Sequence, residues 1–241
     1  MKAFNILIIL TCGLFFSNAN AQSDLQNIIK VNYTSDGVSD FLVGVLKGQM
    51  SDPTELSSMI SLMEEYRIHT SFYQDTRTNE SVFVLDSISE VPGMSISGYA
   101  YYVHRDRDGK LTGKEVFMDK DFNFIGSNEE INWEITNQQK EISGYKCTKA
   151  TMKDDADTYV WFTTEIPVGG GPYVYFGLPG MVLESNSSFE STSVNSVGYT
   201  TMEEFNSMVN SVHHNEEIGD QISLEEVFAK KDNFKRMVAG N

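Results

Sequence analysis

The stretch Thr158–Glu184 reads TYVWFTTEIPVGGGPYVYFGLPGMVLE, and it decides the fold. The side chains of Tyr159–Phe162 alternate between two directions and are apolar in both, which predicts a strand with two apolar faces. Such a strand must be covered on both sides. Gly169–Pro172 is a turn signal, and Met181–Leu183 reads as a second buried strand. This part of the chain is therefore predicted to be β-structure.

The period of two continues outward over about residues 69–196. Within Ile131–Thr136, apolar and polar side chains alternate, which predicts a strand with one wet face. Short turn signals separate the predicted strands, so neighbouring strands should pair as antiparallel hairpins. We treat Asn186–Ser196 as an edge strand or a loop, because it is rich in Ser and Asn. The turn signals are Asp108-Gly109, Lys120-Asp121, Asp154–Asp157 and Gly169–Pro172.

Helices are predicted on both sides of this β region. Apolar residues of Val38–Leu46 follow helical spacing, and a second helix follows Asp52, which can cap it with Glu55. A C-terminal helical segment covers about residues 200–238, with Ser/Thr-to-Glu capping boxes that start at Thr201 and Ser223. The expected class is α+β: one large curved antiparallel sheet, half-barrel-like, with the flanking amphipathic helices packed on one face.

The N-terminus has the pattern of a secretory signal. Lys2 precedes an apolar run, Ile6–Phe16, and Ala19–Ala21 supplies the small residues of a cleavage site. We expect residues 1–21 to be removed and residues 22–241 to form a single domain. The alternative is a short membrane anchor, but this run is shorter than the roughly 18 apolar residues that span a bilayer. The expected location is the periplasm or outer envelope of a Gram-negative bacterium, with no transmembrane segment in the mature chain.

Charge and cysteine content restrict the partners and the chemistry. Removing Lys2 from 18 basic residues leaves 17 against 34 acidic ones, a net charge near −17. Such a chain repels nucleic acid and anionic headgroups. Cys12 leaves with the signal, so Cys147 stays alone, and we expect it to be a small buried side chain on a strand.

A resemblance to a known family rests on several short motifs in order. The chain resembles the GLPGLI family, with Met181-Val182 in place of the last two letters of that hexapeptide, and the matching core covers about residues 131–184. The resemblance implies an exported protein, mostly of Bacteroidota, without an established activity. Related envelope families are similar to lipoprotein-carrier folds, half-open antiparallel barrels around helices. The matching residues are Trp133, Gly144, Tyr145, Cys147, Trp161, Pro167, Gly171, Pro172, Gly177, Leu178, Pro179 and Gly180.

The GLPG sequence also has an interpretation from its residues alone. Leu178–Met181 suits a type II turn in which Gly180 supplies the positive φ, while Gly177 allows a close backbone approach. In that interpretation the motif is architectural. The alternative is a rigid turn that presents the aromatic residues of 173–176, namely Tyr173, Tyr175 and Phe176, to a ligand or partner.

Two segments resemble metal sites. His104–Glu115 places Asp106, Asp108 and Glu115 at positions of a calcium loop, but it begins with His and its flanks read as strands, which favours a charged hairpin. His213–Glu217 gathers imidazoles and carboxylates, but it lacks the spacing that puts two imidazoles on one helix face. We therefore assign no catalytic, cofactor or metal residue and no cofactor.

The sequence leaves three functional hypotheses. The first is a non-catalytic exported protein that binds an apolar small molecule or an outer-membrane partner protein. The alternative is a hydrolase or metal-dependent enzyme with a site built from distant residues. The third is a structural subunit that pairs through an apolar strand edge. The candidates for the enzyme are His69, His104, Asp106 and Glu165.

Overall fold

The computed structural model describes residues 27–89, 91, 98–118, 120–214 and 221–240, so the expected signal segment 1–21 lies outside the described residues. The described strands are β1 Ile28–Asp36, β2 Arg67–Asp75, β3 Ser81–Ile88, β4 Tyr99–Arg105, β5 Lys110–Phe117, β6 Lys120–Ser127, β7 Trp133–Ile142, β8 Tyr145–Met152, β9 Asp155–Thr163, β10 Met181–Asn186, β11 Ser191–Thr200 and β12 Gln221–Ser223. The described helices are α2 Asp40–Gln49, α3 Pro53–Glu65, α4 Met202–His214, α5 Leu224–Ala239 and the short 3-10 helix η1 Asn128–Glu130.

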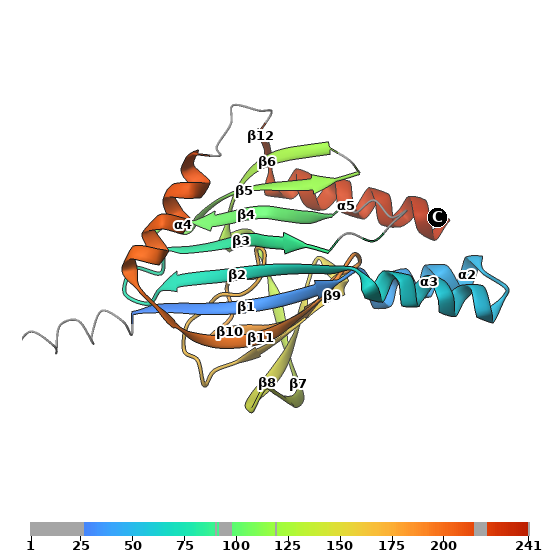
Figure 1. Ribbon diagram of the computed structural model, residues 1–241, viewed down its shortest axis with the longest axis horizontal. Helices are drawn as coiled ribbons and strands as arrows, with labels where there is room; N and C mark the ends of the chain where they lie inside the picture. Colours follow the sequence, from blue (N-terminus) through green and yellow to red (C-terminus); the bar gives the residue numbers. More distant parts are fainter. Residues whose placement is uncertain (1–26, 90, 92–97, 119, 215–220, 241) are drawn as a thin grey trace, which may run out of the picture.

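All twelve described strands belong to one curved sheet (Figure 1). Their order is β12-β6-β5-β4-β3-β2-β1-β11-β10-β9-β8-β7, and the sheet does not close. Every named strand pair is antiparallel except β12 with β6, which is parallel. The predicted α+β class with a large curved antiparallel sheet is confirmed.

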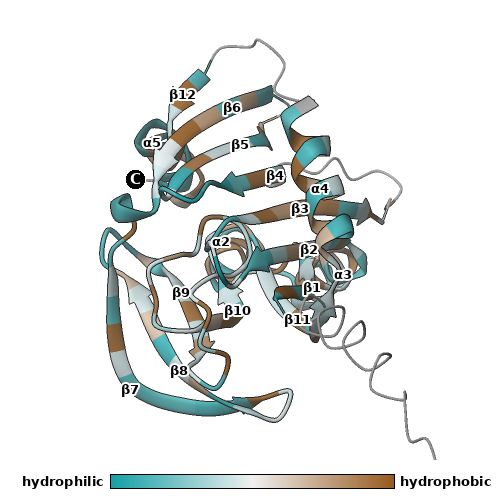
Figure 2. Ribbon diagram, turned by 90° about the vertical axis from the view of Figure 1, so that its left-hand side faces the viewer, coloured by the Kyte–Doolittle hydropathy of each residue, from teal (hydrophilic) through white to brown (hydrophobic). Residues whose placement is uncertain are grey.

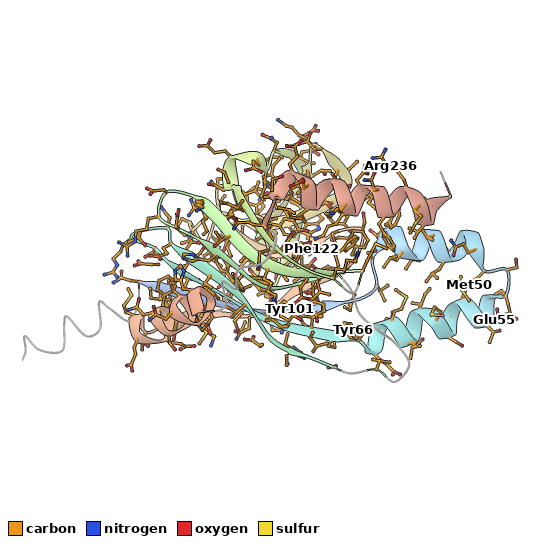
Figure 3. All side chains as sticks on the ribbon, turned by 90° about the horizontal axis from the view of Figure 1, so that it is seen from above. Met50, Glu55, Tyr66, Tyr101, Phe122 and Arg236 are labelled. Atoms are coloured by element: carbon orange, nitrogen blue, oxygen red, sulfur yellow. The ribbon has the colours of Figure 1, made fainter. Side chains whose placement is uncertain are left out.

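Helices α4 and α5 lie on opposite faces of this sheet (Figures 2 and 3). Side chains of β3 explain the arrangement, because successive residues of a strand point to opposite faces. Val82 and Val84 pack with Phe205 of α4, whereas Phe83 belongs to the core that includes Leu224 of α5. The expectation that all helices share one face is therefore wrong.

Lysine side chains cover part of the second face of β9. Val160 is fully buried and Phe162 nearly so, as the double apolar pattern predicts. On the other face, Tyr159 and Trp161 are half-buried, and each carries a lysine over its ring: Lys149 Nζ is 3.7 Å from the Tyr159 ring centre and Lys140 Nζ is 4.6 Å from that of Trp161. Lysine stems can cover apolar surface in this way while their charges stay in water.

The helices α2, α3 and α5 begin at capping residues, and the caps predicted at Asp52 and Ser223 are confirmed. Ser39 caps α2, Asp52 caps α3 with Pro53 in the first turn, and Ser223 forms a complete capping box with Glu226 at the start of α5. Helices α2 and α3 contain no buried residue and form a hairpin that projects beyond the ends of β1 and β2 (Figure 1). Leu62 of α3 is half-buried and packs against the small buried cluster of Tyr66, Ile68 and Val91.

Two strand expectations need correction. Of the alternatives for residues 186–196, the loop holds for 187–190, but the edge strand is wrong: β11 is central, paired with β1 on one side and β10 on the other. Its Ser and Asn side chains are tolerated because several of them bond across strands, as Asn32 Nδ2 does to Ser196 Oγ at 2.9 Å. The edge strands of the described sheet are β12 and β7, and Ile135 of β7 is 53% exposed rather than inward-facing.

In the GLPG motif the two glycines have exchanged their expected roles. Gly177 has the positive φ, 88°, while Gly180 is not among the residues with positive φ. Instead, a Cβ on Gly180 would lie 2.0 Å from the carbonyl oxygen of Thr163 on β9. The segment is fixed further by Trp133, whose Nε1 donates to the carbonyl of Phe176 at 2.7 Å. The type II turn expected at Leu178–Met181 is therefore wrong, although the architectural role is supported.

Candidate functional site

A cavity of about 570 Å³ lies between α5 and the concave face of the sheet. Strands β1 to β4 supply its floor, and the start of β9, the loop before β10 and the β10–β11 turn supply its sides. Helix α5 covers it with Phe228, Lys231 and Lys235, and its mouth opens beside the exposed residues Glu225 and Ala229. In Figure 2, α5 and the β7–β9 end of the sheet lie on the same side of β1–β4, and this concave side holds the cavity.

The floor carries small polar side chains. Ser35 of β1 and Thr192 of β11 are adjacent in register, and their hydroxyl oxygens are 2.7 Å apart. Thr70 and Ser188 also line the cavity, and both are almost fully buried. Within the described part of the chain, their hydroxyl oxygens have no hydrogen-bond partner. Since an unpaired buried hydroxyl costs free energy, the wall has hydrogen-bonding capacity that the protein leaves unused.

A buried ionic cluster lies at the inner end. Tyr173 donates from its hydroxyl to Oε2 of Glu115 at 2.7 Å, and Lys231 Nζ lies 3.1 Å from the same oxygen and 3.2 Å from the Tyr173 hydroxyl. Glu115 is 1% exposed. Burial, and then the neighbouring Glu115 carboxylate, hold the pKa of Tyr173 well above its ordinary value, so Tyr173 stays protonated and donates.

Glu190 is the carboxyl group in the cavity wall with a strongly raised pKa. Burial raises the pKa of Glu190 to about 7, and the carboxylates of Glu115 and Asp36 add to the increase. Lys231 and a hydrogen bond from Ser35 act in the opposite direction. Glu190 is nevertheless half-buried rather than sealed, because the cavity gives solvent some access to it. The group therefore changes charge near neutral pH and can be reached by a ligand.

Aromatic side chains form much of the remaining wall. Tyr173 and Tyr175 come from the Gly-Pro loop that precedes GLPG, and Tyr175 is 4% exposed. Phe189 lies against Phe117 and Phe234, with ring centres 5.5 and 5.8 Å away. The loop thus presents two of the three expected aromatic residues to the cavity, whereas Phe176 packs into the core against Phe72.

The enzyme candidates from the sequence do not meet at this cavity. His69 Nδ1 bonds Thr34 Oγ1 at 3.0 Å, and Glu165 accepts a hydrogen bond from the Lys146 backbone. His104 lies 3.4 Å from Glu80, and burial, followed by the nearby His213, lowers its pKa. Asp106 closes the β4–β5 turn by accepting from the backbone of residues 108 and 110.

The two segments that resemble metal sites do not gather their described side chains around one point either. His104–Glu115 is a β4–β5 hairpin, as predicted, and Glu115 points into the buried cluster rather than toward the turn. At the end of α4, the His213 ring packs edge-on against His104 at 4.8 Å. Residues 215–217 lie outside the described residues. Among the described residues, no group of three or more His, Cys, Asp or Glu side chains is placed to hold a metal ion.

Cys147 has the structural role expected of it. It is fully buried on β8, and burial raises the pKa of its thiol to about 11. A thiol with such a pKa is almost entirely protonated at neutral pH and is a poor nucleophile.

Sequence reasoning did not assign three charged residues in or beside the cavity to this site. Glu115 shares the inward face of β5 with Leu111 and Phe117, so a charge on an apolar face was a usable signal. Lys231 likewise falls on the apolar stripe of α5, four residues after Val227. Glu190 gave no signal, because it sits in a short turn whose burial depends on the distant helix α5.

The cavity has a volume in the range of small-molecule sites and a wall in which apolar surface predominates over polar surface. Its lining also includes charged side chains, among them Glu190 and Lys231. Such an arrangement can hold an apolar body and orient one polar group.

Comparison with known proteins gives few functional clues. The profile of a family described as a protein of unknown function (Porph_ging) matches residues 151–184, a segment that includes β9, Tyr173 and Tyr175. No curated relative matches the chain. None of the described helices combines the length and the apolar character needed to cross a bilayer.

Two crystal forms of PNGF-II are similar to 85% and 86% of this chain, with 11% and 13% sequence identity and TM-scores of 0.45 and 0.46. This chain spans only about a third of PNGF-II, 32% and 33% of its length. An uncharacterised conserved protein from Thermus thermophilus is similar over 86% of this chain and 96% of its own, at 5% identity and a TM-score of 0.38. Similarity at this level indicates neither a shared activity nor a shared ligand.

Proposed function

We propose that this chain is a non-catalytic binding protein that holds a small molecule with an apolar body in the cavity beneath α5. The cavity itself carries the proposal: it has the size and the predominantly apolar wall of a ligand site.

A fluorescence experiment tests the binding site. The probe is N-phenyl-1-naphthylamine, an uncharged fluorophore that brightens in apolar surroundings. Ala229→Trp places an indole at the mouth, and Ala239→Trp places one at the exposed end of the same helix, away from the cavity. We expect the first variant to weaken probe binding at least tenfold and the second to leave it unchanged. Equal binding by both variants would exclude this cavity as the site.

Hydrolysis is the alternative function, and Glu190 is the observation that favours it. A reachable carboxyl group with a pKa of about 7 is suited to general acid or base catalysis. The nearby Glu115 is engaged by Tyr173 and Lys231 and is 1% exposed, so it is not free to act as the second carboxylate. Turnover of p-nitrophenyl esters or glycosides that disappears in Glu190→Gln would establish the enzyme; no turnover is expected.

Assembly by strand addition has weaker support. The β7 edge is largely polar, with Glu134, Gln138, Lys140 and Glu141 all exposed, and charged edges oppose pairing with another chain. A partner protein of the outer membrane therefore has no apolar strand edge to use at β7.

We also propose that the protein is a GLPGLI family member that is exported to the periplasm or outer envelope. The motifs in 131–184 and the signal pattern in residues 1–21 support this. N-terminal sequencing of the protein from its native source should give a chain that begins at Gln22. A mature chain that still begins at Met1 would contradict export by a cleaved signal.

A further inference from the structure

The charged groups around the cavity are unbalanced. Six carboxyl side chains line it, against two lysines. A wall with this excess raises the local concentration of cations and repels anions. The carboxyl groups are those of Glu130, Asp154, Asp155, Glu190, Glu225 and Asp232.

Both lysines are already engaged by other carboxylates of the protein. Lys231 contacts Glu115, and Lys235 Nζ lies 2.7 Å from both Asp155 and Asp157. Among the described residues, Asp154, Glu190 and Glu225 make no ion pair. The protein therefore presents negative charge without an ion-pair partner at the exposed mouth residues Asp154 and Glu225, and Glu190 in the wall adds to it as the pH rises above about 7.

The aromatic wall favours the same kind of ligand. The negative face of an aromatic ring attracts cations, most strongly when water is excluded. The Tyr173 ring already has a cation over it, since Lys231 Nζ is 4.4 Å from its centre. Tyr99, Tyr175 and Phe228 also line the cavity.

We infer that the ligand is an organic cation: a molecule with an apolar body and an amine head that is held beside Glu190. This inference rests on the proposed binding function and specifies its ligand class. The apolar body occupies the aromatic part of the cavity, and the ammonium group meets the carboxylates that lack a partner.

Competition with three matched compounds tests the inference. The compounds are 4-phenylbutylamine, 4-phenylbutanol and 4-phenylbutyrate, which share an apolar body and differ in the charge of the head. Each compound is titrated into the wild-type protein with N-phenyl-1-naphthylamine bound, and the loss of probe fluorescence measures its affinity. We expect the amine to bind at least about tenfold more tightly than the alcohol, and the carboxylate more weakly than both.

Variants that remove a carboxylate charge show which residues cause the preference for the amine. Glu190→Gln keeps the size of the side chain, and we expect it to reduce the preference for the amine several-fold. The double variant Asp154→Asn with Glu225→Gln acts at exposed mouth positions, so it should fold normally and reduce the preference less. Glu203→Gln on α4, on the opposite face of the sheet, is the control and should change nothing.

The outcomes separate this inference from the proposed function. If the probe binds but the alcohol or the carboxylate competes as well as the amine, the ligand is not a cation, although the cavity still binds ligands. An unchanged preference in both Glu190→Gln and the double variant also overturns the inference. If neither the probe nor any of the three compounds binds, as titration calorimetry would show, the proposed function itself fails.

Discussion

Replacing Gly180 by alanine should destabilise the protein strongly, because the backbone of β9 occupies the space that a side chain needs. The added Cβ would lie 2.0 Å from the carbonyl oxygen of Thr163, 2.7 Å from its carbonyl carbon and 3.1 Å from Thr164 Cα. All three are backbone atoms, so no side chain can rotate away to relieve the contact. The strand pair β9–β10 would have to separate, since Met181 is in register with Thr163.

The magnitude follows from the distances. Ordinary contact begins at 3.4 Å, so the two segments would have to move apart by more than about 1 Å in a closely packed core. Overpacking usually costs about 1–3 kcal/mol when side chains can adjust, and this site should reach or exceed about 3 kcal/mol. For a domain of this size, that corresponds to a decrease in Tm of about 6–12 °C.

Thermal unfolding followed by circular dichroism measures the effect, with Gly198→Ala as the control. Gly198 lies on β11 and has no atom within 4 Å of the position of an added Cβ, so its alanine variant should stay within about 2 °C of the wild type. If Gly180→Ala also unfolds within about 2 °C of the wild type, the close approach of the two segments is not a structural requirement. The motif would then need a functional explanation.

Three further predictions concern α5 and the ionic groups. Because the pKa of Glu190 is raised from 4.5 to about 7 in the fold, its ionisation costs folding free energy that appears as pH rises through this interval. Urea unfolding should therefore show Glu190→Gln more stable than the wild type at pH 8, by at most about 3 kcal/mol, and much less so at pH 5. Lys231→Met should cost about 3–5 kcal/mol because Glu115 stays buried without its cation, whereas the exposed Lys230→Met should cost under about 1 kcal/mol. Ser223→Ala removes the capping box of α5 and should cost about 1 kcal/mol by the same measurement; no loss would mean that the cap is not needed.

The GLPG motif illustrates how far local sequence rules reach. The composition correctly predicted the buried strand that follows the motif, and the architectural role of the motif stays a prediction. The composition could not assign the two glycines, because the requirement at Gly180 comes from Thr163, which is 17 residues away and meets it only through strand pairing. Positive φ is a local property, whereas close approach depends on tertiary structure.

Helix placement also depends partly on local sequence and partly on tertiary structure. The capping residues Ser39, Asp52 and Ser223 act within one turn, so their helices were predictable from local sequence. The face that each helix covers was not, because it depends on which strands lie side by side. Phe83 and Val84 point to opposite faces of β3, so they indicated only that both faces needed cover, and not that α4 and α5 would divide them.

The cavity exists because small side chains meet on its floor. Ser35, Thr70, Ala100 and Thr192 occupy positions where larger apolar residues would fill the space beneath α5. The neighbouring floor is filled in that way, by the fully buried rings of Tyr33 and Phe72. The gap therefore reflects the choice of residues at four positions rather than a limit of the fold.

Stability alone does not account for the groups that surround this gap. A buried ion pair such as Lys231–Glu115 is seldom better than apolar side chains of the same volume, and Glu190 is a net cost above neutral pH. A chain selected only for a filled core would replace all three residues. Their presence beside small floor residues favours a site that recognises a ligand, because the positive head of an occupant would offset the cost of ionised Glu190 while its apolar body fills the gap.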